Sequence, residues 1–297
     1  MIEKKTTLEK VFDVFNHLLM FVLLLITLYP FWYVIMCSIS EPSALVGEKG
    51  LMLLPEGFSL TSYKSVFENP NIYTGYRTTI LVVVLGTAFN VIMTSLGAFV
   101  LTRKHFAIRK PMMLLILFTM YFSGGMIPRY LLIYNTLDMG DSIWALILPT
   151  AISTYNLIVM RTNFENIPQS LEEAAKIDGA SDFVVFCKVI MPLSAPIIAV
   201  MVLFYGVDKW NAWFDAMLFM RSREKYPLQL ILREILLYNS ADTSSTMGGD
   251  AGAAEKFMIG EGIRYSTIMV ATVPILCVYP FIQKYFVKGV MIGAVKG

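Results

Sequence analysis

Long apolar segments alternate with short polar ones along this chain, a pattern that predicts several membrane-spanning helices. About 20 apolar residues, at a rise of roughly 1.5 Å each, are needed to cross a bilayer. Six windows approach or exceed that length, and none of them contains Asp, Glu, Lys or Arg. The windows are residues 14–37, 78–102, 112–128, 142–160, 189–207 and 265–283. We therefore expect an all-α membrane protein in which residues 1–297 form a single transmembrane domain of six spans.

The composition agrees with this interpretation. Of the 297 residues, 56% are hydrophobic and 15% are charged, which leaves too few charged side chains to cover a soluble globule of this size. The first window is too long for the apolar core of a signal peptide, so we expect it to be retained as the first span. The net charge of +2 suggests no nucleic-acid partner, and the expected surroundings are membrane lipid.

Basic residues indicate how the spans are oriented. The loop after the second window holds a basic cluster made of Arg103, Lys104, Arg109 and Lys110. Short loops that are rich in Lys and Arg remain in the cytoplasm. Alternation of the spans then places both termini and the loop 161–188 in the cytoplasm, and the long loop 208–264 outside it.

Several kinds of chemistry are not expected of this chain. The sequence has no phosphate-binding G-x-x-x-x-G-K-[ST] loop and no H-E-x-x-H or G-x-S-x-G motif, so we expect no catalytic residue. Its three cysteines and two histidines lack the spacing of a metal site or a disulfide framework. An ionisable group inside the membrane usually marks a proton-coupled transporter, and the six windows have none. A sodium site built from backbone carbonyls would escape that test.

A polar insert between the fourth and fifth windows is the most informative segment. Ser170 and Glu173 have the spacing of a capping box, which predicts the start of a helix. Ala174 and Ala175 would keep one face of that helix flat, and Gly179 would end it in a left-handed conformation. A short polar helix in this position predicts a docking surface for a soluble partner.

Uncharged polar residues within and beside the spans are candidates for contact with a solute. Neutral hydrogen-bonding groups and aromatic rings suit a hydroxyl-rich solute, although Ser, Thr and Asn also join helices without any ligand. The candidates within the spans are Asn90, Tyr121, Tyr155, Asn156 and Tyr205. The candidates just after the fifth span are Trp210, Asn211 and Trp213, which would serve either as interfacial anchors or as a sugar-contacting gate.

Two irregular segments are expected on the outer side. The break Phe122 to Pro128 should end the third span and redirect the chain into a short amphipathic piece at residues 129–137, because Arg129 in lipid would cost a few kcal/mol. In the last outer loop, a helical stretch at residues 228–238 is followed by residues 240–255, which are rich in Ser, Thr, Gly and Ala. That second part is either a linker or a finger that enters a partner.

The insert also carries a family motif. Glu173-Ala174-Ala175, then Gly179 after three residues and Val189-Ile190-Met191-Pro192 after nine more, resemble the E-A-A signature of the permease subunits of binding-protein-dependent ABC importers. The motif's I-x-L-P ending is matched with Val189 for Ile and Met191 for Leu. Trp210-Asn211 and the terminal segment 293–297 are similar to the carbohydrate-uptake branch on the maltose-permease side. The break after Tyr121 resembles a subgroup that serves complex oligosaccharides.

This resemblance implies a bacterial inner-membrane permease that takes up sugars and docks on an ATPase through the insert. By itself such a permease catalyses no reaction. It implies a second permease as heterodimeric partner, two ATPase subunits that hold ATP and Mg, and an extracytoplasmic solute-binding protein. The ATPase-coupling residues would be Ser170, Glu172, Glu173, Ala174, Ala175, Asp178, Gly179 and Pro192. The segment 237–262 takes the place of a loop that reaches into the binding protein, with Tyr238, Asn239 and Ser240 as candidates, and the tail 288–297 is placed near the ATPase.

Two other functions stay open on the sequence. One is a permease for a peptide or another non-sugar solute. The other is a membrane scaffold that docks an ATPase and moves no solute. ATP hydrolysis stimulated by a solute would separate a transporter from a scaffold.

Overall fold

The computed structural model describes residues 6–45, 50–245, 260–278 and 280, which form two compact units. The first unit contains residues 1–69 and 232–272, and the second contains residues 70–231 and 273–297. The described residues are mostly helical. They contain no β-strand, and the one β-bridge among them joins Ser40 to Phe58. The expected all-α fold is therefore confirmed.

The first unit is built around the long helix α1 (Thr7–Ser38). The side chain of Thr6 accepts a hydrogen bond from the backbone N–H of Glu9, and the Glu9 carboxylate accepts one from the N–H of Thr6 at 2.7 Å, which together cap the first turn. The apolar side chains along most of α1 are exposed, as expected for a helix that faces lipid or a partner.

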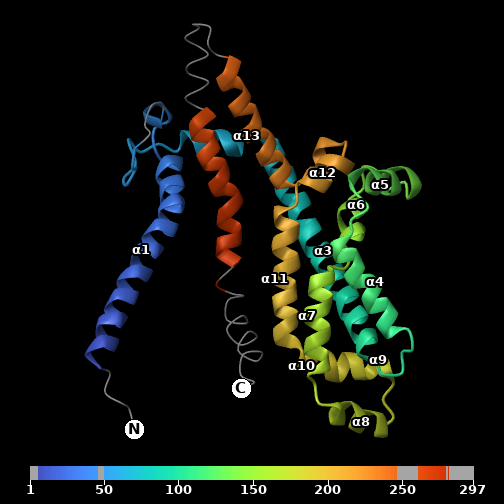
Figure 1. Ribbon diagram of the computed structural model, residues 1–297. Helices are drawn as coiled ribbons and strands as arrows, with labels where there is room; N and C mark the ends of the chain where they lie inside the picture. The colour runs from blue at the N-terminus through green and yellow to red at the C-terminus, as the bar shows by residue number, and fades with distance from the viewer. Residues whose placement is uncertain (1–5, 46–49, 246–259, 279, 281–297) are drawn as a thin grey trace. The chain divides into compact units, whose positions relative to one another are not determined.

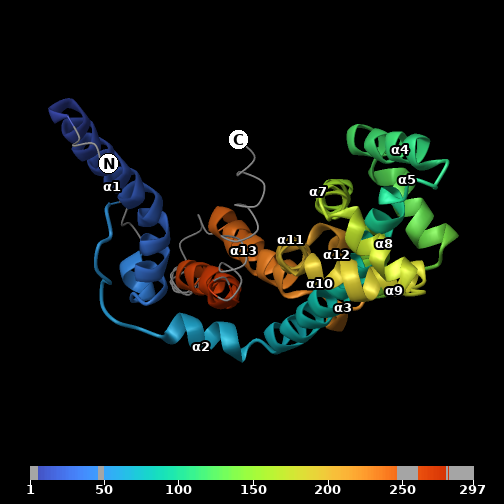
Figure 2. The same cartoon turned by 90° about the horizontal axis from the view of Figure 1, so that it is seen from below.

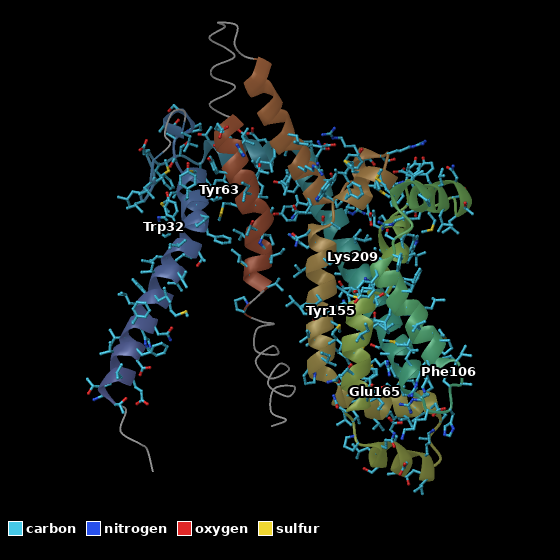
Figure 3. The ribbon with its side chains drawn as sticks, viewed as in Figure 1. Trp32, Tyr63, Phe106, Tyr155, Glu165 and Lys209 are labelled. Carbon is cyan, nitrogen blue, oxygen red and sulfur yellow. The ribbon has the colours of Figure 1, made fainter. Side chains whose placement is uncertain are left out.

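Short elements follow α1 in the same unit. They are the 3-10 turn η1 (Pro42–Leu45) and the helix α2 (Thr61–Glu68). Trp32 and Tyr63, both labelled in Figure 3, tie this region together, since Trp32 Nε1 donates to the carbonyl of Leu53 at 3.0 Å and the Tyr63 hydroxyl donates to Ser38 Oγ at 2.9 Å. A further helix, Gly260–Val278, begins in this unit and is apolar enough to span a membrane.

The second unit is organised by three helices that lie side by side in Figure 1: α3 (Pro70–Thr102), α7 (Thr154–Glu165) and α11 (Ala195–Asn211). Ala98, Met160 and Met201, one from each helix, are fully buried where the three pack. The Tyr205 hydroxyl links the same helices, since it pairs with Thr94 Oγ1 at 2.7 Å and accepts from the Ser153 N–H at 3.0 Å.

A second core lies at the end of the unit where α11 finishes. It contains Val82 of α3, Ile147 of α6 (Trp144–Ile147) and Phe219 of α12 (Phe214–Phe219). The 3-10 turns η3 (Leu148–Thr150) and η5 (Arg223–Lys225) and the first turn of the helix α13 (Leu228–Ser245), up to Ile231, complete the elements around it.

Two pairs of apolar helices are sharply bent. The helix α4 (Arg109–Tyr121) is followed by α5 (Met126–Leu131) and the π-helical turn η2 (Leu132–Thr136) at an angle of 113°. The break expected after Tyr121 is present, and Gly125 takes up the turn with a φ of +87° that few other residues adopt. The helices α9 (Asp182–Val185) and α10 (Met191–Leu193), with the π-helical turn η4 (Phe186–Ile190) between them, meet α11 at 83°.

Among the described residues, three helices are long and apolar enough to cross a membrane: Thr7–Ser38, Pro70–Thr102 and Gly260–Val278. The number rises to five if each bent pair forms one span. The expected window 142–160 is not one continuous helix, because it is divided into α6, η3 and α7. Pro149 lies in the division, and its ring cannot donate the hydrogen bond that a continuous helix would need.

A tight crossing within the second unit generates a stability prediction. A Cβ added at Gly75 of α3 would lie 2.6 Å from Ile231 Cδ1 and 3.1 Å from the Leu228 Cα, whereas a Cβ at Gly124 would have no atom within 4 Å. We expect Gly75→Ala to lower the stability of the detergent-solubilised protein by about 1–3 kcal/mol through overpacking. Gly124→Ala is the matched control and should leave the unfolding temperature unchanged. Equal unfolding temperatures for both variants would contradict the crossing.

Candidate functional site

The polar insert forms the helix α8 (Gln169–Ile177), which lies with α9 and α10 at one end of the second unit (Figures 1 and 2). The expected capping box is wrong. Pro168 occupies the N-cap position, where no side chain bonds to the first turn, and Ser170 already lies within the helix. The ring of Pro168 fixes its φ at −56°, a value suited to the start of a helix. Ser170 lies two residues further along, inside the first turn, and therefore cannot occupy the capping position.

The end of α8 is as the sequence predicts. Gly179 has a φ of +81°, and its N–H donates to the carbonyl of Lys176 at 3.0 Å, while the N–H of Ala180 donates to the carbonyl of Ala175 at 2.9 Å. These two bonds form a Schellman motif, which satisfies carbonyls that the helix end would otherwise leave unpaired. Ala175 and Ala180 also pack against the core shared by α3, α7 and α11.

Two polar contacts hold α8 against the end of α3. The Arg103 guanidinium makes a bidentate ion pair with Glu172, with Nη2 at 3.0 Å from Oε1, and lies 4.1 Å from the ring centroid of Phe99. Lys104 Nζ donates to Gln169 Oε1 at 3.0 Å. Bidentate Arg–carboxylate pairs fix both distance and orientation, so α8 is anchored to a membrane helix instead of being a free loop.

The predicted coupling residues divide into two groups around α8. Glu172 and Ala175 are half-buried against the rest of the unit. The exposed group consists of Ser170, Glu173, Ala174, Asp178, Gly179 and, on α10, Pro192. Ile177 is 87% exposed on the same short helix, although an isoleucine in a self-sufficient surface helix would normally face inward. The surface of α8 therefore includes a large apolar side chain, which was not among the residues predicted from the sequence.

A cavity of about 540 Å³ lies between α8 and the connection from α3 to α4. Glu165, labelled in Figure 3, lines it together with both members of the Arg103–Glu172 pair and with Glu173. Lys176, also in its lining, pairs with Asp182 at 2.9 Å and so ties α8 to α9. Charged groups of both signs therefore surround the exposed part of α8.

A second cavity, of about 350 Å³, lies near the opposite end of α11. Lys209, labelled in Figure 3, is only 4% exposed there, and its Nζ donates to the carbonyl of Leu146 at 2.7 Å and to Thr150 Oγ1. Arg129 forms an ion pair with Asp215 at 2.6 Å across the same space. The cavity thus combines buried charge with the apolar side chains of Val82, Leu146, Phe214 and Pro227.

The candidate solute-contacting residues are brought together only in part. Asn211 and Trp213 line this second cavity. Trp210 instead lies 6.3 Å from Tyr76, measured between ring centroids. Tyr121 is 80% exposed on α4 and Tyr155 is 55% exposed on α7, so neither points into the cavity.

The remaining candidates within the spans lie between helices. Tyr205 links three helices through its hydroxyl, and Asn156 is buried near the start of α7. Asn90 is completely buried on α3, and both polar atoms of its amide lack a hydrogen-bond partner among the described residues. Their placement favours helix packing for Tyr205 and leaves Asn90 as an unpaired polar group in the interior.

Sequence reasoning assigned no site to three charged residues of the second cavity, Arg129, Asp208 and Lys209. The fourth, Asp215, belongs to the segment after the fifth span that was a candidate sugar-contacting gate. One signal was present for Lys209. It follows Tyr205 by four residues, so on a continued helix both side chains share one face and Lys209 must turn inward.

Three predicted segments fall partly or wholly outside what can be described. Tyr238, Asn239 and Ser240 lie within the helix α13, and the structure describes only their backbone. The loop 237–262 is described only up to residue 245 and from residue 260, and the tail 288–297 lies outside the described residues.

The all-α fold, with its long apolar helices and the polar helix α8 anchored at one end of the second unit, defines a multi-pass membrane protein. Residues 94–212 match the family described as binding-protein-dependent transport system inner membrane component. The chain is 43% identical over 293 residues to the Bacillus subtilis polygalacturonan/rhamnogalacturonan transport system permease protein YtcP, covering 97% of this chain and 99% of that protein. It is 40% identical to protein LplC of the same organism, with 98% and 97% covered.

A solved structure agrees in fold. The chain superimposes with a TM-score of 0.83 and 31% identity on a chain of a bacterial ABC transporter involved in the import of the acidic polysaccharide alginate, covering 95% of this chain and 99% of that one. The protein therefore belongs to the family of permease subunits of binding-protein-dependent ABC importers. It is a multi-pass protein of the bacterial inner membrane and a transport component whose family works with ATPase and solute-binding partners.

A charged cluster outside the candidate spans generates a pH prediction. The Asp141 carboxylate accepts hydrogen bonds from Lys225 Nζ at 2.7 Å, from Ser222 Oγ at 2.6 Å and from the N–H of Arg221 at 3.0 Å. Lys225 foremost, and then Ser222, hold the pKa of Asp141 well below its usual range. A carboxylate with a lowered folded-state pKa stabilises the fold above its unfolded pKa, and this stabilisation is lost as the pH falls through the folded pKa.

We expect Asp141→Asn to lower the unfolding temperature at pH 7, because it removes the charge but keeps a residue that tolerates the φ of +56° found there. The difference from the unsubstituted protein should shrink as the pH falls below about 4, the ordinary pKa of Asp. Thermal unfolding in detergent between pH 7 and pH 3 measures it. A difference that is independent of pH would contradict the role of the charge. Asp138→Asn, at another residue with positive φ, controls for the backbone.

Proposed function

We propose that this protein is the permease subunit of an ATP-driven importer that takes up oligosaccharides delivered by a solute-binding protein. The observation that carries the proposal is the helix α8, which is exposed on one side, capped by Gly179 and anchored to α3 through Arg103 and Glu172. Sugar transport is supported by the names of relatives that match along nearly the whole chain. The solute moves by alternating access, as the ATPase shifts the population between two states.

Coupling to the ATPase occurs at α8. Glu173 and Asp178 are exposed there and can make polar contacts, and the exposed side chain of Ile177 can enter an apolar pocket of the partner. Displacement of α8 passes to α3 through the Arg103–Glu172 pair, and to the shared core through Ala175 and Ala180. An anchored helix transmits a displacement, whereas a free loop would absorb it.

The assembly contains a second, homologous permease as heterodimeric partner and two ATPase subunits that bind ATP and Mg and carry out hydrolysis. Both termini and α8 lie in the cytoplasm, and the cavity around Lys209 lies toward the binding protein. The basic cluster beside α8, Arg103, Lys104, Arg109 and Lys110, supports this orientation. The exposed apolar surface of α1 suits contact with lipid or with the second permease.

Two alternatives are weaker. A permease for a non-sugar solute is disfavoured by the relatives named for sugar transport. A scaffold that moves no solute gives α8 a partner but leaves the charged cavity around Lys209 without a role. ATP hydrolysis by the reconstituted complex should rise when the loaded binding protein is added. A rate of ATP hydrolysis that is the same with and without the loaded binding protein would favour the scaffold.

The conformation of Gly179 provides the first test. Gly179→Pro should abolish sugar uptake, because proline fixes φ near −65° and removes the N–H that donates to Lys176. Gly179→Asn is the matched control and should retain most uptake, because Asn tolerates positive φ. Uptake by cells, with membrane insertion checked on a blot, measures both. Normal uptake by a well-inserted Gly179→Pro variant would remove α8 as the coupling element.

The Arg103–Glu172 anchor provides the second test. We expect Glu172→Gln to reduce stimulation of ATP hydrolysis by the loaded binding protein severalfold, because a half-buried bidentate ion pair becomes a single neutral contact. Glu165→Gln is the matched control, since Glu165 pairs with Arg161 within α7 and its loss leaves α8 attached. Equal stimulation of ATP hydrolysis in both variants would show that the Arg103–Glu172 pair does not transmit the displacement of α8 to α3.

A further inference from the structure

Lys209 is a buried cation without a carboxylate partner. Its Nζ is held by two neutral oxygens, the Leu146 carbonyl and Thr150 Oγ1, and among the described residues no carboxylate lies within ion-pair distance of it. An ammonium group has three N–H donors, so one remains for another acceptor. Burying a charge without a counter-charge is costly, and ionisable groups in such places are usually functional.

The helix opposite Lys209 leaves room for it. A Cβ on Gly86 of α3 would lie 3.2 Å from Lys209 Cε and 3.4 Å from Cδ, closer than ordinary contact allows. Glycine at this position therefore allows the lysine stem to lie directly against the α3 backbone. The ammonium is directed past α3 to the end of α6, in the lining of the 350 Å³ cavity.

The other charges of the cavity leave Lys209 as its uncompensated buried group. Arg129 neutralises Asp215 through their 2.6 Å ion pair. Asp208 also lines the cavity, but its side chain is exposed, so water screens its charge far more than that of Lys209. Lys209 is thus the buried charged group of this lining that has no ion-pair partner among the described residues, although the formal charges of the lining sum to zero.

The rest of the lining suits a sugar ring. Trp213 and Phe214 offer aromatic surface, and Asn211 offers an amide that can bind hydroxyls. The volume lies at the lower end of the range of small-molecule sites, which is about 300–1,000 Å³. A pyranose that carries a carboxylate would satisfy both the aromatic surface and the unpaired ammonium donor.

We propose that this cavity is a carboxylate-binding subsite and that the cargo is an acidic, uronate-containing oligosaccharide whose carboxylate binds Lys209. The inference rests on the proposed function, which it narrows to one class of sugar. One relative is named for polygalacturonan transport, and the matched solved structure is described as importing an acidic polysaccharide, which agrees with this chemistry.

The test is direct binding of trigalacturonate and of its uncharged trimethyl ester to the complex of both permeases and the ATPases in nanodiscs, without binding protein, by ligand-observed NMR titration. The complex should bind the acid at least about tenfold more tightly than the ester, since a hydrogen bond to a charged group contributes about that much. Lys209→Met should bring the two affinities together, and added salt should weaken the preference of the unsubstituted complex. Lys225→Met, a lysine paired with Asp141 outside the cavity, should retain the preference.

The outcomes separate the subsite from the transport proposal. Co-purification of each variant with the second permease and the ATPase, at the same size-exclusion volume as the unsubstituted complex, establishes that it is folded and assembled. Equal affinity of the unsubstituted complex for acid and ester, no binding of either, or a preference that survives Lys209→Met would each overturn the subsite. The importer would stand in all three cases if the loaded binding protein still stimulated ATP hydrolysis, and it would fail on its own if that stimulation were absent.

Discussion

The second unit depends on one interaction, the hydrogen bonds of the Tyr205 hydroxyl. This group joins α11 to Thr94 of α3 and to the N–H of Ser153, which caps α7. In a hydrocarbon environment water cannot satisfy these groups, so the three helices must keep the register that pairs them. The same register places Lys209, one turn further along α11, against Gly86, and brings the end of α3 to α8. The buried Tyr205 contact thus lies on the same three helices that carry the Lys209 cavity and α8.

Local features were predictable from the sequence because they depend on neighbouring residues. The apolar windows, the break after Tyr121 and the left-handed turn at Gly179 follow from hydropathy and backbone conformation. The helix start at Pro168 was misassigned because two rules competed, and proline geometry prevailed over the side-chain cap. The division of the window 142–160 into two helices was not predicted, because one proline hardly changes the mean hydropathy of the window.

The candidate site was less predictable because it is made of long-range pairs. Arg129 and Asp215 are 86 residues apart, and so no local pattern indicates their ion pair. Lys209 lies just beyond a charge-free window, and only the packing of α11 against α3 shows that it is buried. The helix α8 and its end at Gly179 were predictable because the motif is contiguous, while the residues of the cavity come together only in the fold. Its neutral candidates, Tyr121 and Tyr155, proved to be exposed elsewhere.

Gly179 combines empty surroundings with a left-handed backbone conformation. No atom lies within 4 Å of the position that a Cβ would take, so the residue is needed for its φ of +81° and not for its small size. The requirement concerns handedness alone, since the left-handed region is strained only for residues of L configuration. A mirror-image amino acid installed here by protein semisynthesis would find this backbone relaxed. The turn could then carry a D-residue with a fluorophore or a crosslinker beside α8 without disturbing the helix it ends.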